Sequence, residues 1–289
     1  MDAALRKLLL KYQKIENTGH VIYNRMAFRE KNAENKKILM RMAIEEREHA
    51  RILQHYTGED PQADRLQVWW YSFLGWLFGY TFVIRLMENG ETLTIKEYTA
   101  LVDQIPEFAR IIQEEEIHEE KLMGMLDEER LQYVGAMVLG LNDALVELTG
   151  TIAGLTFALE HTRIVALAGI ITGVSATLSM AASNYLAERA DGNPNAFKSS
   201  LYTGFAYLVT VVLLVLPYLT YPEDMYFEAL ATMLVIVILI IFVFNYYVAV
   251  AKNLPFMKRF GEMACISLGV AVISFAIGLL AKNFLDIDL

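Results

Sequence analysis

Two short motifs place a glutamate and a histidine one helical turn apart. Glu46 is followed by His49, and Glu115 is followed by His118. Because residues three apart lie on one face of an α-helix, each pair can offer a carboxylate and an imidazole to the same metal ion. Carboxylate and imidazole donors suit both Fe2+ and Mn2+, and they do not discriminate between the two ions. One such pair on an acidic helix is usually a solvated face, but two pairs favour a metal site.

Each pair is preceded by a glutamate on an earlier helix. Glu16 lies 30 residues before Glu46, and Glu88 lies 27 residues before Glu115, which indicates an approximate internal duplication. The hydrophobic pattern predicts four long helices and one short helix, over residues 3–30, 33–56, 65–89, 94–104 and from Pro106 onwards. We expect the four long helices to form a bundle that directs the glutamates inward, towards a di-iron site with Mn2+ as the alternative metal.

This arrangement, over about residues 5–128, resembles the rubrerythrin-like branch of the ferritin-like proteins. In ferritin-like bundles, two helices each give one glutamate and the other two each give a Glu-x-x-His pair. The resemblance implies a set of metal ligands, namely Glu16, Glu46, His49, Glu88, Glu115 and His118. It also makes Glu91 a candidate for an additional ligand. His20 and Glu119 lie close to these ligands in the sequence, and either supports a ligand or is solvated.

Charge and composition exclude some partners and divide the chain. Of the 289 residues, 55% are hydrophobic and 20% are charged. The formal net charge of −9 argues against a nucleic-acid partner, which would require a basic surface. The single Cys265 excludes an intramolecular disulfide. Charged residues are frequent up to about residue 130 and long apolar runs follow, so we expect one domain over 1–130 and a second over 131–289.

The second domain contains five apolar stretches of the roughly 20 residues that a helix needs to cross a bilayer. They cover about residues 133–159, 164–187, 201–221, 226–250 and 262–282. Lys and Arg concentrate in the second and fourth connectors, and the positive-inside rule places these connectors in the cytoplasm. The N-terminal domain is then cytoplasmic and the C-terminus lies on the outer side. We expect an integral protein of a prokaryotic cell membrane, although the residues by themselves do not identify the membrane.

Two carboxylates interrupt the first apolar stretch. Asp143 and Glu147 lie four residues apart and therefore share one helical face. A carboxylate near mid-membrane costs at least about 2.5 kcal/mol on insertion scales. The pair indicates a site for cations and protons, unless it lies near the membrane edge, where side chains can reach the headgroups. Glycines four residues apart indicate close helix packing, at Gly150 and Gly154 and at Gly169 and Gly173.

Three segments of the second domain resemble the vacuolar iron transporter family: GLNDALVELTGTIAGL, GIITGVSATLSMAASNYLAERA and AYLVTVVLLVLPYL. The resemblance covers residues 131–289 and implies a five-helix membrane domain that moves Fe2+ or Mn2+ against protons. It also implies that Asp143 and Met180 line the ion route. Asn184 stands where the family commonly has a glutamate, which implies either weaker metal binding or a shift of the proton-carrying role to Glu147. The connector after the second span is short, where the family commonly has a long, glutamate-rich hairpin.

One uncharged stretch in the first domain, residues 66–84, is nearly long enough to be a sixth span. If it crossed the bilayer, Glu16 and Glu46 would lie on the opposite side from Glu115, and no single four-helix site could form. We therefore interpret it as a helix that is buried in the bundle and in contact with a second copy. Its Trp and Tyr residues also suit the headgroup region of a membrane.

A ferritin-like domain ahead of a vacuolar-iron-transporter domain resembles the membrane-bound ferritin-like proteins. This resemblance implies a homodimeric exporter of Fe2+, or of Mn2+, that works by proton antiport, with a cytosolic bundle that captures or senses the metal. The alternatives are a membrane-anchored di-iron ferroxidase or peroxide-reducing enzyme, and a metal-sensing scaffold without flux. We assign no catalytic residue. Asp143 and Glu147 argue against a simple anchor, which has no need of costly carboxylates in its spans.

Overall fold

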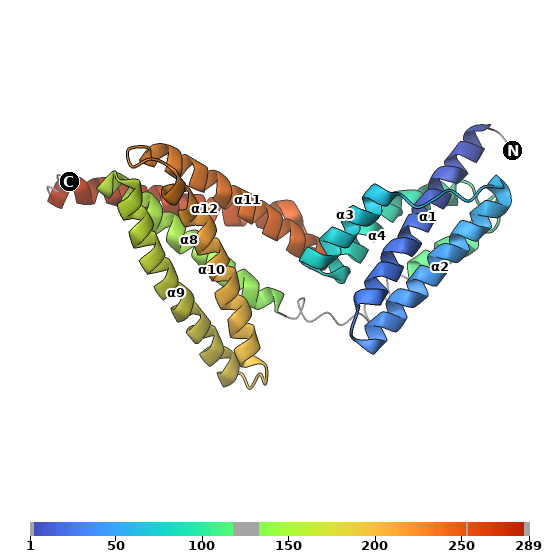
Figure 1. The fold of residues 1–289 in the computed structure, drawn as a ribbon, viewed down its shortest axis with the longest axis horizontal. Coiled ribbons are helices and arrows are strands. Elements are labelled where there is room, and N and C mark those ends of the chain that lie inside the picture. The colour runs from blue at the N-terminus through green and yellow to red at the C-terminus, as the bar shows by residue number, and fades with distance from the viewer. Residues whose placement is uncertain (1–2, 104, 118–132, 253, 286–289) are drawn as a thin grey trace. The chain divides into compact units, whose positions relative to one another are not determined.

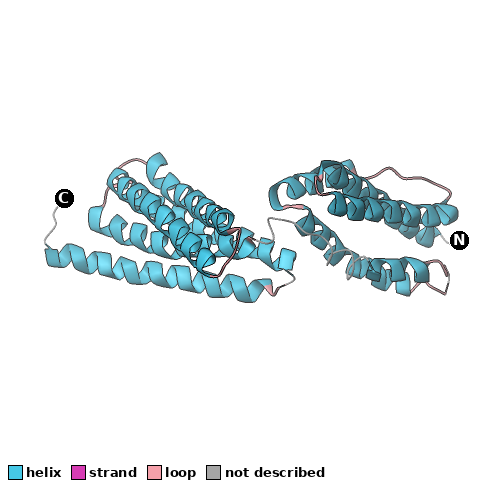
Figure 2. Cartoon of the chain, turned by 90° about the horizontal axis from the view of Figure 1, so that it is seen from below, coloured by secondary structure: helices cyan, strands magenta, loops and turns pink. Residues whose placement is uncertain are grey.

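The computed structural model describes residues 3–103, 105–117, 133–252 and 254–285, except for the side chains of 88–96, 116–117 and 281–285. In these residues all regular secondary structure is α-helical (Figure 2). The chain divides into two compact units, Met1–Glu129 and Arg130–Leu289. The prediction of an all-α fold is confirmed.

Five helices form the described part of the first unit: α1 (Ala3–Arg29), α2 (Ala33–Thr57), α3 (Arg65–Phe78), α4 (Tyr80–Thr99) and α5 (Phe108–Ile117). Helices α1 and α2 pack side by side along their length (Figure 1). Asn32 begins α2, because its side-chain oxygen accepts hydrogen bonds from the first backbone N–H groups of the helix. Gly58 ends α2 in a left-handed conformation with φ 71°. The two caps define the ends of α2, and only three residues connect it to α1.

The single helix predicted over 65–89 is wrong. The chain breaks at Gly79, whose φ of 93° and ψ of 163° are readily adopted only by glycine. Helix α4 then continues to Thr99, so the short helix predicted over 94–104 is not a separate element. The predicted burial of the 66–84 stretch holds for the start of α4, where Phe82 and Val83 are buried. It fails for α3, which exposes most of its large side chains.

A small apolar core lies between α1, α2, α4 and α5. Its buried members are Leu9, Tyr12, Leu53, Tyr98, Ile105, Phe108 and Ile111. Two aromatic neighbours hold the ring of Tyr98. It stacks on Phe108, with ring centroids 4.4 Å apart, and it meets Tyr12 edge-on, with centroids 4.9 Å apart. Aromatic pairs in these geometries add to the energy gained by burial. The packing fixes the position of the Tyr98 hydroxyl.

The second unit contains α8 (Val134–Leu159), α9 (Thr162–Ala190), α10 (Ala196–Thr220), α11 (Tyr226–Lys252) and α12 (Phe256–Leu285). Each is long and apolar enough to cross a membrane, and they are the five such helices among the described residues. The prediction of five spans is confirmed. The 66–84 stretch offers no sixth span, because α3 has 14 residues and a length of about 21 Å, against a hydrocarbon core of about 30 Å.

Helix α8 packs against α12, α10 and α9. Small residues make the closest approaches possible. A Cβ added to Gly278 of α12 would lie 2.4 Å from the carbonyl oxygen of Gly154 in α8, and one added to Gly173 would lie 2.4 Å from Val211. The glycine pairs noted in the sequence therefore serve ordinary helix packing.

Candidate functional site

Three buried side chains of α1 and α2 form a group that could hold a metal ion. One ligand atom each from Glu16, Glu46 and His49 lies within 4.8 Å of the other two. Glu16 is 5% exposed, Glu46 is 3% exposed and His49 is fully buried. Gly19 leaves room for this group, since a Cβ there would lie 2.8 Å from Oε2 of Glu46. The spacing on α2 and the packing of α1 on α2 thus bring the three ligands together.

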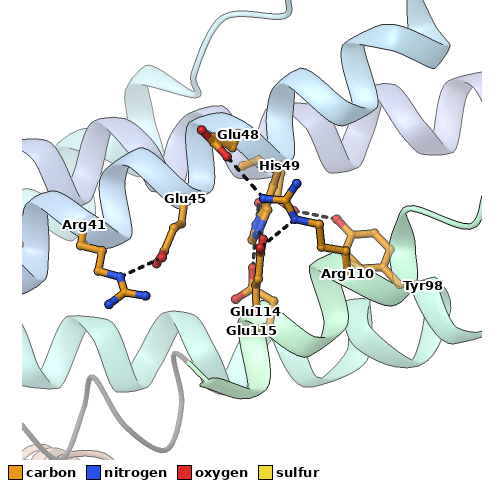
Figure 3. A network of polar contacts seen from close by, with 9 residues as sticks. Arg41, Glu45, Glu48, His49, Tyr98, Arg110, Glu114 and Glu115 are labelled. Atoms are coloured by element: carbon orange, nitrogen blue, oxygen red, sulfur yellow. Dashed lines mark hydrogen bonds and ion pairs between the residues drawn. The ribbon is translucent and has the colours of Figure 1, made fainter.

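Helix α5 completes the surroundings of His49 (Figure 3). Oε1 of Glu115 lies 2.9 Å from Nδ1 of His49, and Oε2 of Glu16 lies 3.5 Å from the same nitrogen. On the other edge of the ring, Oε2 of Glu114 lies 2.9 Å from Nε2. Both nitrogens of the imidazole therefore face carboxylates, which come from two different helices.

The carboxylates determine the charge of His49. Burial by itself lowers the pKa of this imidazole, but the hydrogen bonds and charges of Glu115 and Glu16 raise it to about 11. Without a metal the ring carries a proton at neutral pH and offsets part of the negative charge around it. A bound cation would displace one proton of the ring, because only the neutral imidazole is a ligand. Buried carboxylates in excess of cations are costly, which makes the group a favourable place for a divalent cation. Glutamate and imidazole donors fit Fe2+ and Mn2+.

Two further side chains support the ligands and were missed by the sequence analysis. The Tyr98 hydroxyl donates a hydrogen bond to Oε1 of Glu16 at 2.7 Å. Glu114 accepts one from Nε of Arg110 at 2.8 Å. Although burial raises the pKa of Glu114, Arg110 and His49 together lower it below its usual value. Tyr98 lies far from Glu16 in the sequence, so spacing gave no signal for this contact.

The predicted ligands divide into two groups. Glu16, Glu46, His49 and Glu115 converge on one buried place, as described above. The side chains of Glu88 and Glu91, and the whole of His118, lie outside the described residues. Among the secondary candidates, Nδ1 of His20 lies 2.6 Å from the carbonyl oxygen of Ala43, to which it must donate, and Glu119 is outside the described residues. The full ligand set stays a prediction.

In the second unit, the two carboxylates lie well inside α8. At 1.5 Å per residue, Asp143 and Glu147 are about 14 Å and about 20 Å from the start of a helix about 39 Å long. Asp143 is half-buried, whereas Glu147 is exposed on the single chain. The buried Tyr207 of α10 donates a hydrogen bond to Oε2 of Glu147 at 2.9 Å. This depth argues against the alternative in which the pair reaches the headgroups from the membrane edge.

Met180 and Asn184 lie further along α9. Met180 is partly buried and packs against the apolar core of the unit. Asn184 is buried and donates to Oγ of Ser199 at 3.0 Å. Ser199 in turn donates to Oε1 of Glu188 at 2.9 Å, and Asn193 donates to Oε2 at 2.6 Å. These polar groups line a cavity of about 480 Å3. Glu188, one turn beyond Asn184, is the acidic residue of this cavity that the sequence analysis missed.

Comparison with known proteins bears on the second unit. Residues 134–193, which cover α8, α9 and the connector after α9, match the sequence model of the VIT family. No curated protein matches the chain. The family match lies outside residues 1–129, so the ferritin-like interpretation of the first unit rests on its side chains alone. The five apolar helices support an integral membrane protein, and the VIT family match lies in the first two of them, in the second unit.

Proposed function

We propose that this protein exports Fe2+, or Mn2+, across a membrane in exchange for protons, and that its first unit captures or senses the metal. The observation that carries the proposal is the pair of carboxylates deep in α8, within the segment that matches the VIT family. A carboxylate at this depth is too costly to keep in a helix that only anchors the protein. The hydrogen bond from Tyr207 to Glu147 adds a polar group at the same depth.

The exchange follows from the chemistry of the ligands. A carboxylate binds a divalent cation only when it is deprotonated, so a proton that enters from the outer side competes with the metal at Asp143 and Glu147. Met180 offers a thioether, a weak ligand that allows quick release. Asp143 and Glu147 then carry the metal ion in one direction and protons in the other, because they bind one or the other at a time.

We place the N-terminal unit and the connectors rich in Lys and Arg in the cytoplasm, and the C-terminus outside. We also propose a homodimer. The exposed carboxylate of Glu147 would face lipid if the chain acted alone, at a cost of several kcal/mol. A second copy packed on this side of α8 would cover Glu147 and could contribute to the ion route.

The first unit is proposed to be a ferritin-like site for two iron ions, held by Glu16, Glu46, His49 and Glu115 together with the predicted Glu88, Glu91 and His118. Iron bound there would supply redox chemistry towards dioxygen or peroxide. The described ligands are at most 9% exposed, which favours a site that exchanges metal slowly. Slow exchange suits a retained cofactor, and it therefore favours the second candidate function, a membrane-anchored ferroxidase or peroxide-reducing enzyme.

The proposal is tested by metal flux in proteoliposomes that contain the full chain and carry an imposed pH gradient. We expect proton-dependent Fe2+ or Mn2+ flux for the wild type and its loss in Asp143→Asn. Asp191→Asn is the matched control, since Asp191 is an exposed carboxylate just after α9, and it should transport normally. Glu115→Gln should keep flux but change its dependence on metal concentration.

The enzyme alternative predicts the opposite pattern. If the wild type shows no proton-coupled flux but consumes dioxygen rapidly when Fe2+ is added, the transport proposal is overturned. In that case Glu115→Gln, and not Asp143→Asn, should abolish the activity. The two variants thus separate the two functions within one set of preparations.

A further inference from the structure

Helix α3 is apolar on nearly every side, and a large part of its apolar surface points to solvent. The exposed side chains recur at helical spacing and form one stripe, which we call the aromatic face: Leu66, Trp69, Trp70, Phe73, Trp76 and Leu77. Trp69 is 60% exposed and Trp76 is 67% exposed. Of the nine exposed large hydrophobic side chains in the described part of the first unit, these six lie on α3. The exposure is therefore concentrated on one helix.

The opposite side of α3 is held by the bundle. Val68 and Leu74 are buried, and α3 packs against α1 and α4. Near Gly75, an added Cβ would contact Met26 of α1 at 3.5 Å and Val83 of α4 at 3.6 Å. Because these contacts fix the rotation of α3, the aromatic face cannot turn inward without breaking the packing of the unit.

The composition of the aromatic face suits the boundary of a bilayer. The chain has 3 tryptophans, and all of them lie on this stripe. The rings form a continuous cluster, in which Trp69 stacks on Phe73 with centroids 6.0 Å apart and Phe73 lies 6.2 Å from Trp76. Indole rings are favoured at the level of the headgroups, where one part of the ring is in an apolar medium and the N–H is hydrated. The one charged residue of α3 is Arg65 at its start, which suits a phosphate group.

The chain itself brings a bilayer within reach. Sixteen residues separate the end of α5 at Ile117 from the start of the first span at Val134. A segment of this length spans at most about 60 Å when fully extended. The first unit is thus held at a high effective concentration near the membrane. Helix α3 is too short to cross the hydrocarbon core, so an apolar helix face at this distance can enter the bilayer only by lying in its plane.

We propose that α3 is a membrane-docking helix, which inserts its aromatic face into the headgroup region of the lipid bilayer that holds the second unit. Docking restricts the rotation and height of the first unit above the membrane, and so presents its metal group to the bilayer surface in one orientation. The proposal depends on the five spans and on α3, and it holds whether the second unit transports metal or only anchors the chain.

The tryptophans themselves provide the assay, since the intrinsic tryptophan emission of the full chain comes from α3 alone. The wild type is reconstituted into phosphatidylcholine vesicles in which the lipid is unbrominated, brominated near the headgroup end of the acyl chains, or brominated near their methyl end. An interfacial helix inserts its apolar face by about 5–10 Å, so we expect the shallow bromines to reduce the emission about twofold and the deep bromines to reduce it less.

Variants separate docking from a general effect of reconstitution. Leu66→Glu combined with Phe73→Glu leaves all three reporters in place, changes exposed positions only, and should abolish the quenching by brominated lipid. The matched control is Ile44→Glu, which changes an exposed apolar side chain of α2 outside the aromatic face and should leave the quenching unchanged.

Two outcomes overturn the proposal. If brominated lipid has no effect and iodide on both sides of the membrane quenches the emission, the aromatic face is in water. If neither quencher acts, the face is covered by protein, such as a second copy of the chain. Both outcomes are independent of metal flux, so a failure of docking is distinguishable from a failure of the transport proposal.

Discussion

Gly19→Ala is expected to weaken metal binding at the first unit without unfolding it. The new Cβ would lie 2.8 Å from Oε2 of Glu46 and 3.1 Å from its Cδ, whereas ordinary van der Waals contact begins at 3.4 Å. The carboxylate must therefore move by about 0.6 Å, which exceeds the tolerance of about 0.2 Å for a metal-ligand distance. Mutations of groups that hold a metal ligand in place typically cost about 10–100-fold in metal affinity, and we expect a loss of this order here.

The folding cost should be small, because the clash is with the end of a flexible side chain and alanine is favoured over glycine in a helix by about 1 kcal/mol. The assay is competition between the full chain in detergent and a chromophoric chelator for Mn2+, together with thermal unfolding. Gly75→Ala is the matched control. The new Cβ would contact Met26 at an ordinary 3.5 Å, and Gly75 is not next to any ligand in the sequence, so the metal affinity of this variant should not change. Unchanged affinity in a folded Gly19→Ala variant would refute the assignment of Glu46 as a ligand, and Glu46→Gln should then also bind normally.

Two further predictions concern stability. Tyr98→Phe keeps the ring stack but removes the hydrogen bond to the buried Glu16. It should destabilise the metal-free first unit by about 1.5–3 kcal/mol, which would lower the midpoint of thermal unfolding. An unchanged midpoint would show that the hydrogen bond is not formed in solution. Gly278→Ala places a Cβ 2.4 Å from the backbone oxygen of Gly154 and should destabilise the second unit in detergent by about 1–3 kcal/mol. The control Gly269→Ala, whose Cβ would have nothing within 4 Å, should not destabilise it. Equal midpoints of thermal unfolding for the two variants would contradict the packing of α8 on α12.

The fold was predictable wherever the pattern of apolar residues was long and regular. The five spans were recognised because each contains more apolar residues than a soluble helix needs, and their predicted bounds differ from the structure by at most six residues. Helices α1 and α2 agree with the predicted ranges 3–30 and 33–56 to within one residue at each end, because their apolar pattern is regular. The break at Gly79 was missed, since a glycine inside an apolar run is compatible with a continuing helix and only the backbone conformation identifies it as an end.

The same distinction applies to the candidate site. Residues three apart on one helix share a face whatever surrounds them, so the pairing of Glu46 with His49 was available from the spacing alone. The contacts of His49 with Glu114 and of Glu16 with Tyr98 join different helices, and no local pattern specifies them. They depend on the rotation of each helix about its axis, which the bundle core sets.

The sequence by itself determined that the chain is helical, which segments can cross a membrane, and which residue types could bind a divalent cation. Tertiary structure alone decided which faces of those helices meet. The reason is clearest in α3, which is apolar on nearly every side, so that its periodicity cannot say which side is inside. Packing against α1 and α4 buries Val68 and Leu74 and leaves all three tryptophans outside, and it is this choice of face that turns an apparent core helix into a surface for a membrane.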